Sequence, residues 1–401
     1  MKKLLVILGV CLLAFAFAGA DLFAAQGHGL NPYRTPEFVR NPAQMANTVD
    51  PLAIAVYNPA GFTKLQDGFY VGLGNIYILK ENEYVTSSKT YKQEEPSPLV
   101  PTAAFAWKAG KAVLFANLEV IDGGGKLEYK EFPWMITTPL TAYGEGKLEA
   151  ESSWKQFKVG VSAELNEMIS LTGGVRYIMA ETKAKVTVIS SSSALVSGVL
   201  KDEETKMTGQ GGFFGINLTP VKEATINVTY FTKAFVDGEK KDKKAGTKTQ
   251  NTDIVPSYLT VGVAYAVMPE LTVSAGFNYV YTKEEKHGDA DSDKNFTNQK
   301  NALEVALGAD YKANEMLTLS AGWAIKKAGG KSETYQTSGE AANPDLDLQV
   351  FGGGAKITAM PGLNINAGIM KAFFKEGKNV AGDTTYKRDA WLFSLGVDYK
   401  I

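Results

Sequence analysis

The stretch Asp50–Asp67, DPLAIAVYNPAGFTKLQD, is the part of the sequence around which the rest can be organised. An apolar run leads directly into Asn58, Pro59, Ala60 and Gly61. Pro59 fixes its own φ, lacks an amide proton and biases Asn58 towards an extended backbone. Gly61 can adopt dihedral angles that are closed to other residues. The pattern predicts a compact segment that packs its apolar side and then turns sharply, not a strand or a long helix.

The surrounding segment, residues 21–66, is rich in Gly, Pro and Asn and lacks a two-residue alternation. We expect short helical turns around Glu37–Arg40 and Leu52–Val56. A disordered linker is the alternative, but the apolar content is high for disorder, because disordered segments contain few large apolar residues. The segment therefore needs a surface to pack against, and the lumen of a barrel would provide one.

Residues 1–20 are typical of a secretory signal peptide. Lys2 and Lys3 precede an apolar run, and Ala18-Gly19-Ala20 supplies small residues for cleavage after Ala20 or, alternatively, near Ala25. A membrane anchor is disfavoured because the apolar run is shorter than the ~20 residues that a spanning helix needs. No later stretch resembles such a helix, so a mature chain in a membrane would have to form a closed barrel.

Residues 67–401 read as strands with a two-residue alternation. In Tyr258–Val267 and Leu271–Thr282, large apolar side chains on one face oppose Gly, Ala, Ser, Thr and Asn on the other. The strand that ends at Ile401 alternates in the same way. Apolar side chains outward and small or polar ones inward are typical of a transmembrane barrel. A soluble sandwich or propeller also alternates, but its strands are usually only about five or six residues long.

The connections between these strands alternate in length. Six short turns are expected near residues 108–111, 166–167, 220–223, 268–270, 313–315 and 360–362. Seven long polar loops lie between them: Ser87–Pro98, Gly124–Gly146, Ser190–Gly198, Asp237–Asp253, Glu284–Asn295, Lys327–Pro344 and Glu376–Thr385. Thirteen connections give fourteen strands, with counts of about twelve or sixteen left open. The predicted fold class is all-β, a transmembrane antiparallel β-barrel with both chain ends on the short-turn side.

An Asn-Pro-Ala-Gly element ahead of such a chain resembles the FadL/TodX-type outer-membrane transporters of long-chain fatty acids and other hydrophobic compounds. The resemblance implies that residues 21–66 form a hatch plugging the lumen of a barrel of residues 67–401, and that Asn58, Pro59, Ala60 and Gly61 belong to its gate. It also implies a kinked third strand that opens a lateral hole in the wall.

The glycines at the place that matches this kink are Gly123, Gly124 and Gly125. Glycines inside a strand mark a bulge or bend. The alternative is a loop that simply begins at Gly123.

Two features could contact a ligand. Bulky apolar residues follow in the next predicted loop: Phe132, Trp134, Met135, Ile136 and Leu140. Such a patch is costly in water unless it packs or binds something, so it predicts either a groove for an acyl chain or a loop folded over the barrel mouth. Arg176 points into the lumen by alternation with Val175 and Tyr177. It could hold a ligand carboxylate or pair with an inward acid such as Glu164.

Composition narrows the remaining functions. A net charge of −1 and a pI near 6.3 give no support for a nucleic-acid partner. With Cys11 as the one cysteine, no disulfide or thiolate metal site is expected. The two histidines are His28 and His287, and we expect His287 to lie in a solvated loop, so no enzyme is predicted. The acidic run Asp289–Asp293 lacks the spacing of a calcium loop.

The sequence thus predicts a bacterial outer-membrane channel for passive uptake of hydrophobic molecules, with long-chain fatty acids as the first candidate. Release sideways near Gly123 and release into the periplasm both stay open. The alternative is a structural or adhesive surface barrel without transport. The expected partners are hydrophobic small molecules, outer-membrane lipid, which the lysine-rich stretch Lys240–Lys248 could touch, and the barrel-assembly machinery. We expect a monomer that needs no cofactor.

Overall fold

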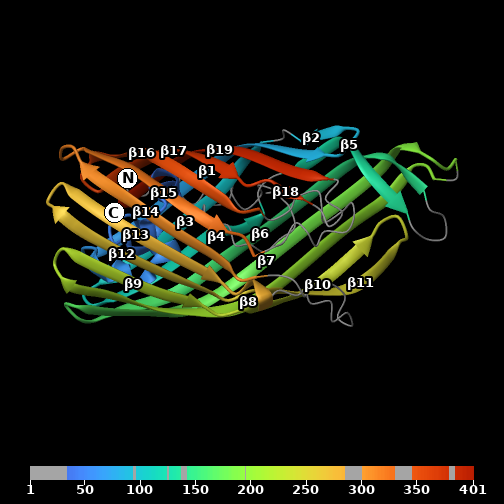
Figure 1. Ribbon diagram of the computed structural model, residues 1–401. Helices are drawn as coiled ribbons and strands as arrows, with labels where there is room; N and C mark the ends of the chain where they lie inside the picture. Colours follow the sequence, from blue (N-terminus) through green and yellow to red (C-terminus); the bar gives the residue numbers. More distant parts are fainter. Residues whose placement is uncertain are drawn as a thin grey trace.

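The computed structural model describes residues 34–93, 96–123, 126–136, 142–194, 196–284, 300–329, 346–378 and 384–401, with backbone only for 134–136 and 142. The predicted signal peptide, residues 1–20, lies outside these ranges. The described strands form one antiparallel sheet that closes on itself (Figure 1), because β1 (Gly68–Val85) pairs both with β3 and with the last strand, β19 (Thr385–Lys400).

Fourteen strands of the described chain make the wall, which confirms the predicted antiparallel barrel and its strand count. Besides β1 and β19 they are β3 (Ser97–Ala109), β4 (Ala112–Gly123), β6 (Ala142–Asn166), β7 (Ile169–Ser191), β8 (Val199–Val221), β9 (Ala224–Phe231), β12 (Tyr258–Met268), β13 (Leu271–Val280), β14 (Ala302–Lys312), β15 (Leu317–Lys327), β16 (Leu348–Met360) and β17 (Leu363–Phe374).

The two ends of the barrel differ. The six short turns lie at one end together with the C-terminus, on the left in Figure 1. The long connections lie at the other end, where they carry the short helix η3 (Thr282–Glu284) and five further strands: β2 (Thr90–Gln93), β5 (Leu127–Ile136), β10 (Ala234–Asp242), β11 (Thr247–Val255) and β18 (Gly377–Lys378). The alternation of short and long connections predicted from the sequence is therefore present.

Two of the predicted long loops are wrong in detail, because much of each forms strands. Within Gly124–Gly146, β5 pairs with β6, and within Asp237–Asp253, β10 pairs with β11 in a hairpin that includes most of Lys240–Lys248. β5 buries Leu127 and Tyr129 on one face, but the charged residues between and around them make the stretch read as a polar loop. Backbone ladders and cross-strand ion pairs hold these strands, as between Lys147 Nζ and Glu128 Oε1 at 2.8 Å.

The outward face of the wall is largely apolar, as the alternation predicted. Large side chains that point outward and are exposed include Phe105, Trp107, Phe157, Val161, Leu171, Val175, Tyr177, Val263, Tyr265, Leu307, Phe351, Trp391 and Leu395. In the described ranges, no helix has the length and apolar character needed to cross a membrane.

The N-terminal residues 34–66, which we call the plug, lie inside the barrel at the short-turn end (Figure 1, blue). The plug contains α2 (Pro36–Arg40), η1 (Gln44–Ala46), α3 (Pro51–Tyr57) and η2 (Pro59–Lys64). Proline opens three of these elements, at the position where its missing amide proton costs nothing. The helical turns predicted around Glu37–Arg40 and Leu52–Val56 are confirmed.

Glycines on the inner face of the wall make room for the plug. A Cβ on Gly262 would lie 2.4 Å from the backbone of Met45, and one on Gly396 would lie 2.8 Å from the ring of Pro36. Contacts under 3.0 Å would force the plug to shift. The small inward residues of the alternation thus bring the plug close enough to bury its apolar side chains: Phe38, Val39, Met45, Leu52, Ile54, Val56 and Tyr57.

Candidate functional site

Asn58 and Gly61 act together in the turn between α3 and η2. Asn58 Nδ2 donates to Asn217 Oδ1 of β8 at 2.8 Å and to the carbonyl oxygen of Asn47 at 3.1 Å. Gly61 is required because a Cβ there would lie 2.7 Å from Asn58 Nδ2 and 3.0 Å from the carbonyl of Asn47. Ala60 is fully buried. The motif therefore joins one part of the plug to another and to the wall.

Further hydrogen bonds join the plug to neighbouring strands of the same side of the wall. Ser162 Oγ donates to the carbonyl oxygen of Pro59 at 2.8 Å. The remaining contacts are Asn227 Nδ2 to the carbonyls of Met45 and Tyr57 at 2.8 and 2.9 Å, Thr63 Oγ1 to Ser170 Oγ at 2.7 Å, and Lys158 Nζ to the carbonyl of Val56 at 3.3 Å. The strands β6 to β9 thus hold the C-terminal half of the plug by polar contacts.

A buried charged cluster lies where the plug begins. Glu119 of β4 contacts Lys158 Nζ of β6 at 2.8 Å and Arg34 Nη1 of the plug at 3.2 Å. Gln156 Nε2 donates to the same carboxylate at 2.8 Å. The Arg34 guanidinium also donates to the hydroxyl of Tyr258 at 3.3 Å. Three segments far apart in the sequence therefore meet at a single carboxylate.

Arg176 of β7 belongs to the same cluster. Its side chain is fully buried inside the barrel, donates to Gln156 Oε1 at 3.0 Å, and lies 5.5 Å from the centre of the Tyr258 ring. The predicted inward orientation is present, but the suggested pairing with Glu164 is wrong. Glu164 pairs in register with Ser170 near the β6–β7 turn, well down the strand from Arg176.

The cluster carries more positive than negative charge. Arg34, Lys158 and Arg176 supply three cations, and Glu119 supplies one anion. The Nε donors of Arg34 and Arg176 are buried and have no acceptor among the described residues. Buried donors without acceptors are costly, and a charge-assisted bond to an anion would satisfy them. The cluster is therefore suited to an anionic ligand group.

A small cavity adjoins Arg34. It has a volume of about 20 Å³, enough for one water molecule. Its walls include Tyr258, Asn278, Glu304 and Lys326. Glu304 and Lys326 contribute opposite charges, so the net positive charge of the site stays the same.

Apolar side chains line the barrel from this cluster towards the long-connection end. On β6 and β7, Trp154 and Ile178 follow Gln156 and Arg176 at the next inward positions. The same buried cluster includes Ile121, Ala180, Met207 and Val236. The interior thus offers a long apolar surface that ends at a site with excess positive charge.

The strand β4 is irregular where the lateral kink is predicted. Its pairing with β6 shifts register between Val120 and Asp122, and Gly123 has a φ of +90°. A Cβ on Gly123 would lie 2.5 Å from the carbonyl oxygen of Ser152, so glycine is needed there. β4 ends at Gly123, and the other two glycines of the predicted portal, 124 and 125, lie outside the described residues.

Phe132 is packed instead of forming an open groove. It is buried with Tyr91, Leu127, Tyr129 and Leu148, and its ring centre lies 5.0 Å from those of Tyr84 and Tyr129. Of the other apolar residues predicted to bind a ligand, Trp134, Met135 and Ile136 lie in β5 with only their backbone described, and Leu140 lies outside the described residues.

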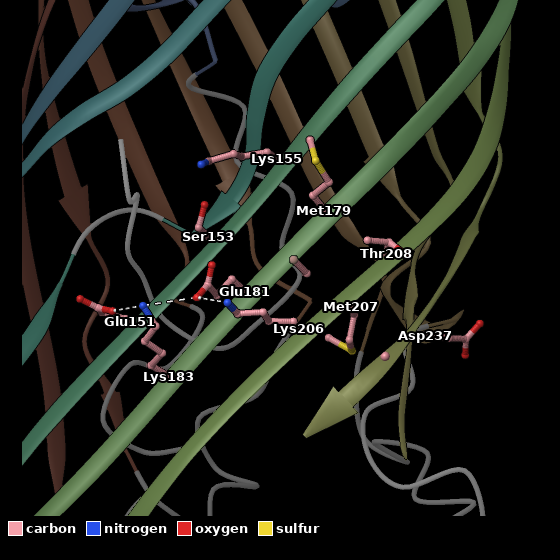
Figure 2. A pocket seen from close by; sticks show the side chains of 12 residues that line it. Glu151, Ser153, Lys155, Met179, Glu181, Lys183, Lys206, Met207, Thr208 and Asp237 are labelled. Atoms are coloured by element: carbon pink, nitrogen blue, oxygen red, sulfur yellow. Dashed lines mark ion pairs between the residues drawn. The ribbon is translucent and has the colours of Figure 1, made fainter. Parts of the chain in front are cut away.

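A second, larger hollow lies away from this site. It measures about 430 Å³ and is bordered by outward-facing side chains of β6, β7, β8 and β10 (Figure 2). Lys183 Nζ forms ion pairs with Glu151 and Glu181 at 3.3 Å, and Lys206 Nζ forms one with Glu181 at 3.4 Å. It begins directly beyond an outward aromatic row that includes Tyr177. Most of its lining side chains face outward, and Ala180 and Met207 of the buried interior cluster also border it.

Sequence reasoning missed most of the charged cluster. Lys158 could have been found, because the alternation that places Arg176 inward places Lys158 inward on the neighbouring strand. The alternation of β4 likewise places Glu119 inward, on the same face as Phe115 and Asn117. Arg34 gave no such signal, since it lies in irregular sequence. His28, His287 and the acidic run Asp289–Asp293 lie outside the described residues. Within those residues, no group of three or more His, Cys, Asp or Glu side chains could hold a metal ion.

Solved structures with the same architecture include a FadL homologue and two toluene transporters. A FadL homologue of Pseudomonas aeruginosa superposes with a TM-score of 0.63 at 14% identity, covering 95% of this chain and all of that one. The toluene transporters TodX of P. putida and TbuX of Ralstonia pickettii give TM-scores of 0.63 and 0.62 at 14% identity, each covering 87% of this chain and 94% of theirs. The fold is that of a plugged outer-membrane barrel.

Curated relatives cover only part of the chain. Outer membrane protein P1 of Haemophilus influenzae strain Rd is 28% identical over 195 residues, which are 43% of this chain and 41% of that protein. The chain thus matches less than half the length of these relatives, and no family model matches it. It is a protein of the bacterial outer membrane, and its barrel has the FadL/TodX-type fold.

Proposed function

We propose that this protein is a channel for passive entry of hydrophobic molecules through the outer membrane, and that its substrates are amphiphiles with an apolar chain and a carboxylate, long-chain fatty acids first. The proposal is supported by the excess positive charge around Arg34, Lys158 and Arg176 at the end of an apolar lining. An acyl chain would lie along Trp154 and Ile178, with its carboxylate accepting from the unpartnered guanidinium donors.

The plug is the proposed gate. It fills the short-turn end of the barrel, and Asn58 and Pro59 contact the wall through single hydrogen bonds to Asn217 and Ser162. Each such bond contributes only about 1 kcal/mol, so a modest shift of η2 could break them. Ligand bound at Arg34, which belongs to the plug, would be coupled to that shift. Release sideways past the β4 irregularity at Gly123 is the proposed exit, with the periplasmic end as the alternative.

Binding to the purified barrel tests the carboxylate site. Labelled palmitate and the alkane hexadecane are titrated into the native protein and into Arg176→Gln. Loss of one charge-assisted hydrogen bond, about 1.5–3 kcal/mol, should weaken palmitate binding by about 10- to 100-fold and leave hexadecane unchanged. Arg388→Gln is the matched control, because Arg388 donates to Asn82 at the long-connection end of the barrel, outside the charged cluster. Equal loss for both ligands, or none, would count against the site.

Deletion of Asn58–Ala60 tests the gate. Palmitate uptake by cells should fall while the barrel still assembles, which heat-modifiable gel mobility reports. Unchanged uptake would refute a gating role for the motif.

A further inference from the structure

Two buried carboxylates lie where the plug packs on β19, on the side of the plug opposite Asn58. Glu37 lies in α2, and Asp398 lies on the inward face of β19. Both are buried, with 0% and 1% of their surface exposed. α2 packs on β16, β17 and β19, and Ser394 Oγ of β19 donates to the carbonyl of Pro36 at 3.3 Å. Pro36, the residue before Glu37, also packs on Gly396, two residues before Asp398, so both acids lie in the same part of the interior.

The nearby cations are engaged with other acids. Arg40 contacts Asp50 at 3.1 Å and Asp310 at 3.0 Å, and Lys356 contacts Asp50 at 2.9 Å. Lys356 and Arg40 outweigh the effect of burial and lower the pKa of Asp50 to about 2. The two cations are thus ion-paired with Asp50 and Asp310, and among the described residues neither forms an ion pair with Glu37 or Asp398.

The oxygens of these two carboxylates are poorly satisfied. Asp398 Oδ2 accepts from Asn366 Nδ2 at 3.0 Å, but among the described residues no hydrogen bond of good geometry reaches Asp398 Oδ1 or either oxygen of Glu37. Burying an ionised carboxylate without a partner costs several kcal/mol, so such groups tend to become neutral. Asp398 Oδ1 is tightly packed: a Cβ built on Gly72 would lie 2.6 Å from it, and Leu52 lies beside it. This packing favours the neutral, protonated carboxyl over an ionised one that needs hydration.

We propose that Glu37 and Asp398 form a proton-binding site that fastens the plug to β19. With a proton bound, the pair is compatible with burial and α2 stays packed on β19, which we call the seated state. Without the proton, two like charges repel in a region of low dielectric and α2 separates from the wall, which we call the released state. Burial and repulsion from Asp50 raise the pKa of Glu37 to about 7, which supports the proposal.

The sign of the pH dependence follows from this. In the released state the carboxyl groups are in water and ionise near pH 4.3. Between about pH 5 and pH 7 the seated state therefore binds at least one more proton than the released state. The ratio of released to seated plug should rise at least about tenfold per pH unit over that window.

The position of the plug can be measured directly by the distance between two nitroxide labels. One label is placed on the plug at Val49→Cys, where the native side chain is 57% exposed, and one on the exposed β8–β9 turn at Glu223→Cys, in a Cys11→Ser background. The displaced population should grow by at least about 100-fold relative to the seated one from pH 5 to pH 7. The measurement needs no fatty acid, so its outcome is independent of the proposed transport function.

Variants of the pair give the decisive comparison. Glu37→Gln with Asp398→Asn should stay seated at every pH from 5 to 8, and Glu37→Gln alone should show a weaker dependence. Glu315→Gln, which removes an exposed carboxylate at the same end of the barrel, should behave like the native protein. Heat-modifiable gel mobility confirms that each barrel is folded. A native plug position that does not change with pH, or a pH dependence that persists in the double variant, would overturn the proposal.

Discussion

Glu119→Gln should strongly destabilise the barrel, because Glu119 is the anion that compensates the buried cations of the interior site. Its contacts at 2.8 Å with Lys158 and 3.2 Å with Arg34 correspond to about 6 and 5 kcal/mol of Coulomb attraction at an effective dielectric constant of 20. Much of this offsets the desolvation of the ions. Removing one partner of such a buried group costs about 3–5 kcal/mol, which is the expected loss of unfolding free energy.

Equilibrium unfolding by guanidinium in lipid vesicles measures this loss. Lys158→Met with Glu119→Gln should recover part of it, because one uncompensated cation disappears together with the anion. The exposed Glu315→Gln should change the unfolding free energy by less than about 0.5 kcal/mol. Palmitate should stabilise Glu119→Gln more than the native barrel, since its carboxylate replaces the missing charge. A loss below about 1 kcal/mol for Glu119→Gln would refute the view that this carboxylate balances the site.

Three further substitutions test local geometry. Asn58→Ala removes the bonds to Asn217 and Asn47, about 1 kcal/mol each, and should raise the conductance of the reconstituted barrel as the plug loosens. Gly61→Ala should have a similar effect, since its Cβ would meet Asn58; a conductance equal to native would contradict the packing. Gly123→Ala should lower the unfolding free energy by about 1–2 kcal/mol through its φ of +90°, and an unaltered denaturation midpoint would exclude strain there.

The sequence predicted the barrel well because a wall between two environments imposes a two-residue alternation. Strands such as Tyr258–Met268 show it directly, and the glycines that face the plug fall on its inward positions. The ribbons β5 and β10–β11 were missed because their apolar positions are few and lie among charged residues. A short apolar alternation interrupted by Lys, Glu and Asp reads as a polar loop.

The interior site could be predicted only in part. Alternation placed Arg176 inward but could not give its height in the barrel. A slip of two residues in register keeps a side chain on the same face and moves it by about 7 Å. Three such steps along β6 separate Lys158, the observed neighbour of Arg176, from Glu164, the predicted one. Arg34 comes from irregular sequence, and its position depends on how the plug packs against glycines of the wall.

The pairing of β1 with β19 over sixteen register positions joins the first and the last strand of the described wall. The plug precedes β1 in the chain, and it lies inside the wall that this pairing closes. Closure of the wall therefore encloses a segment that the chain supplies before any strand of the wall.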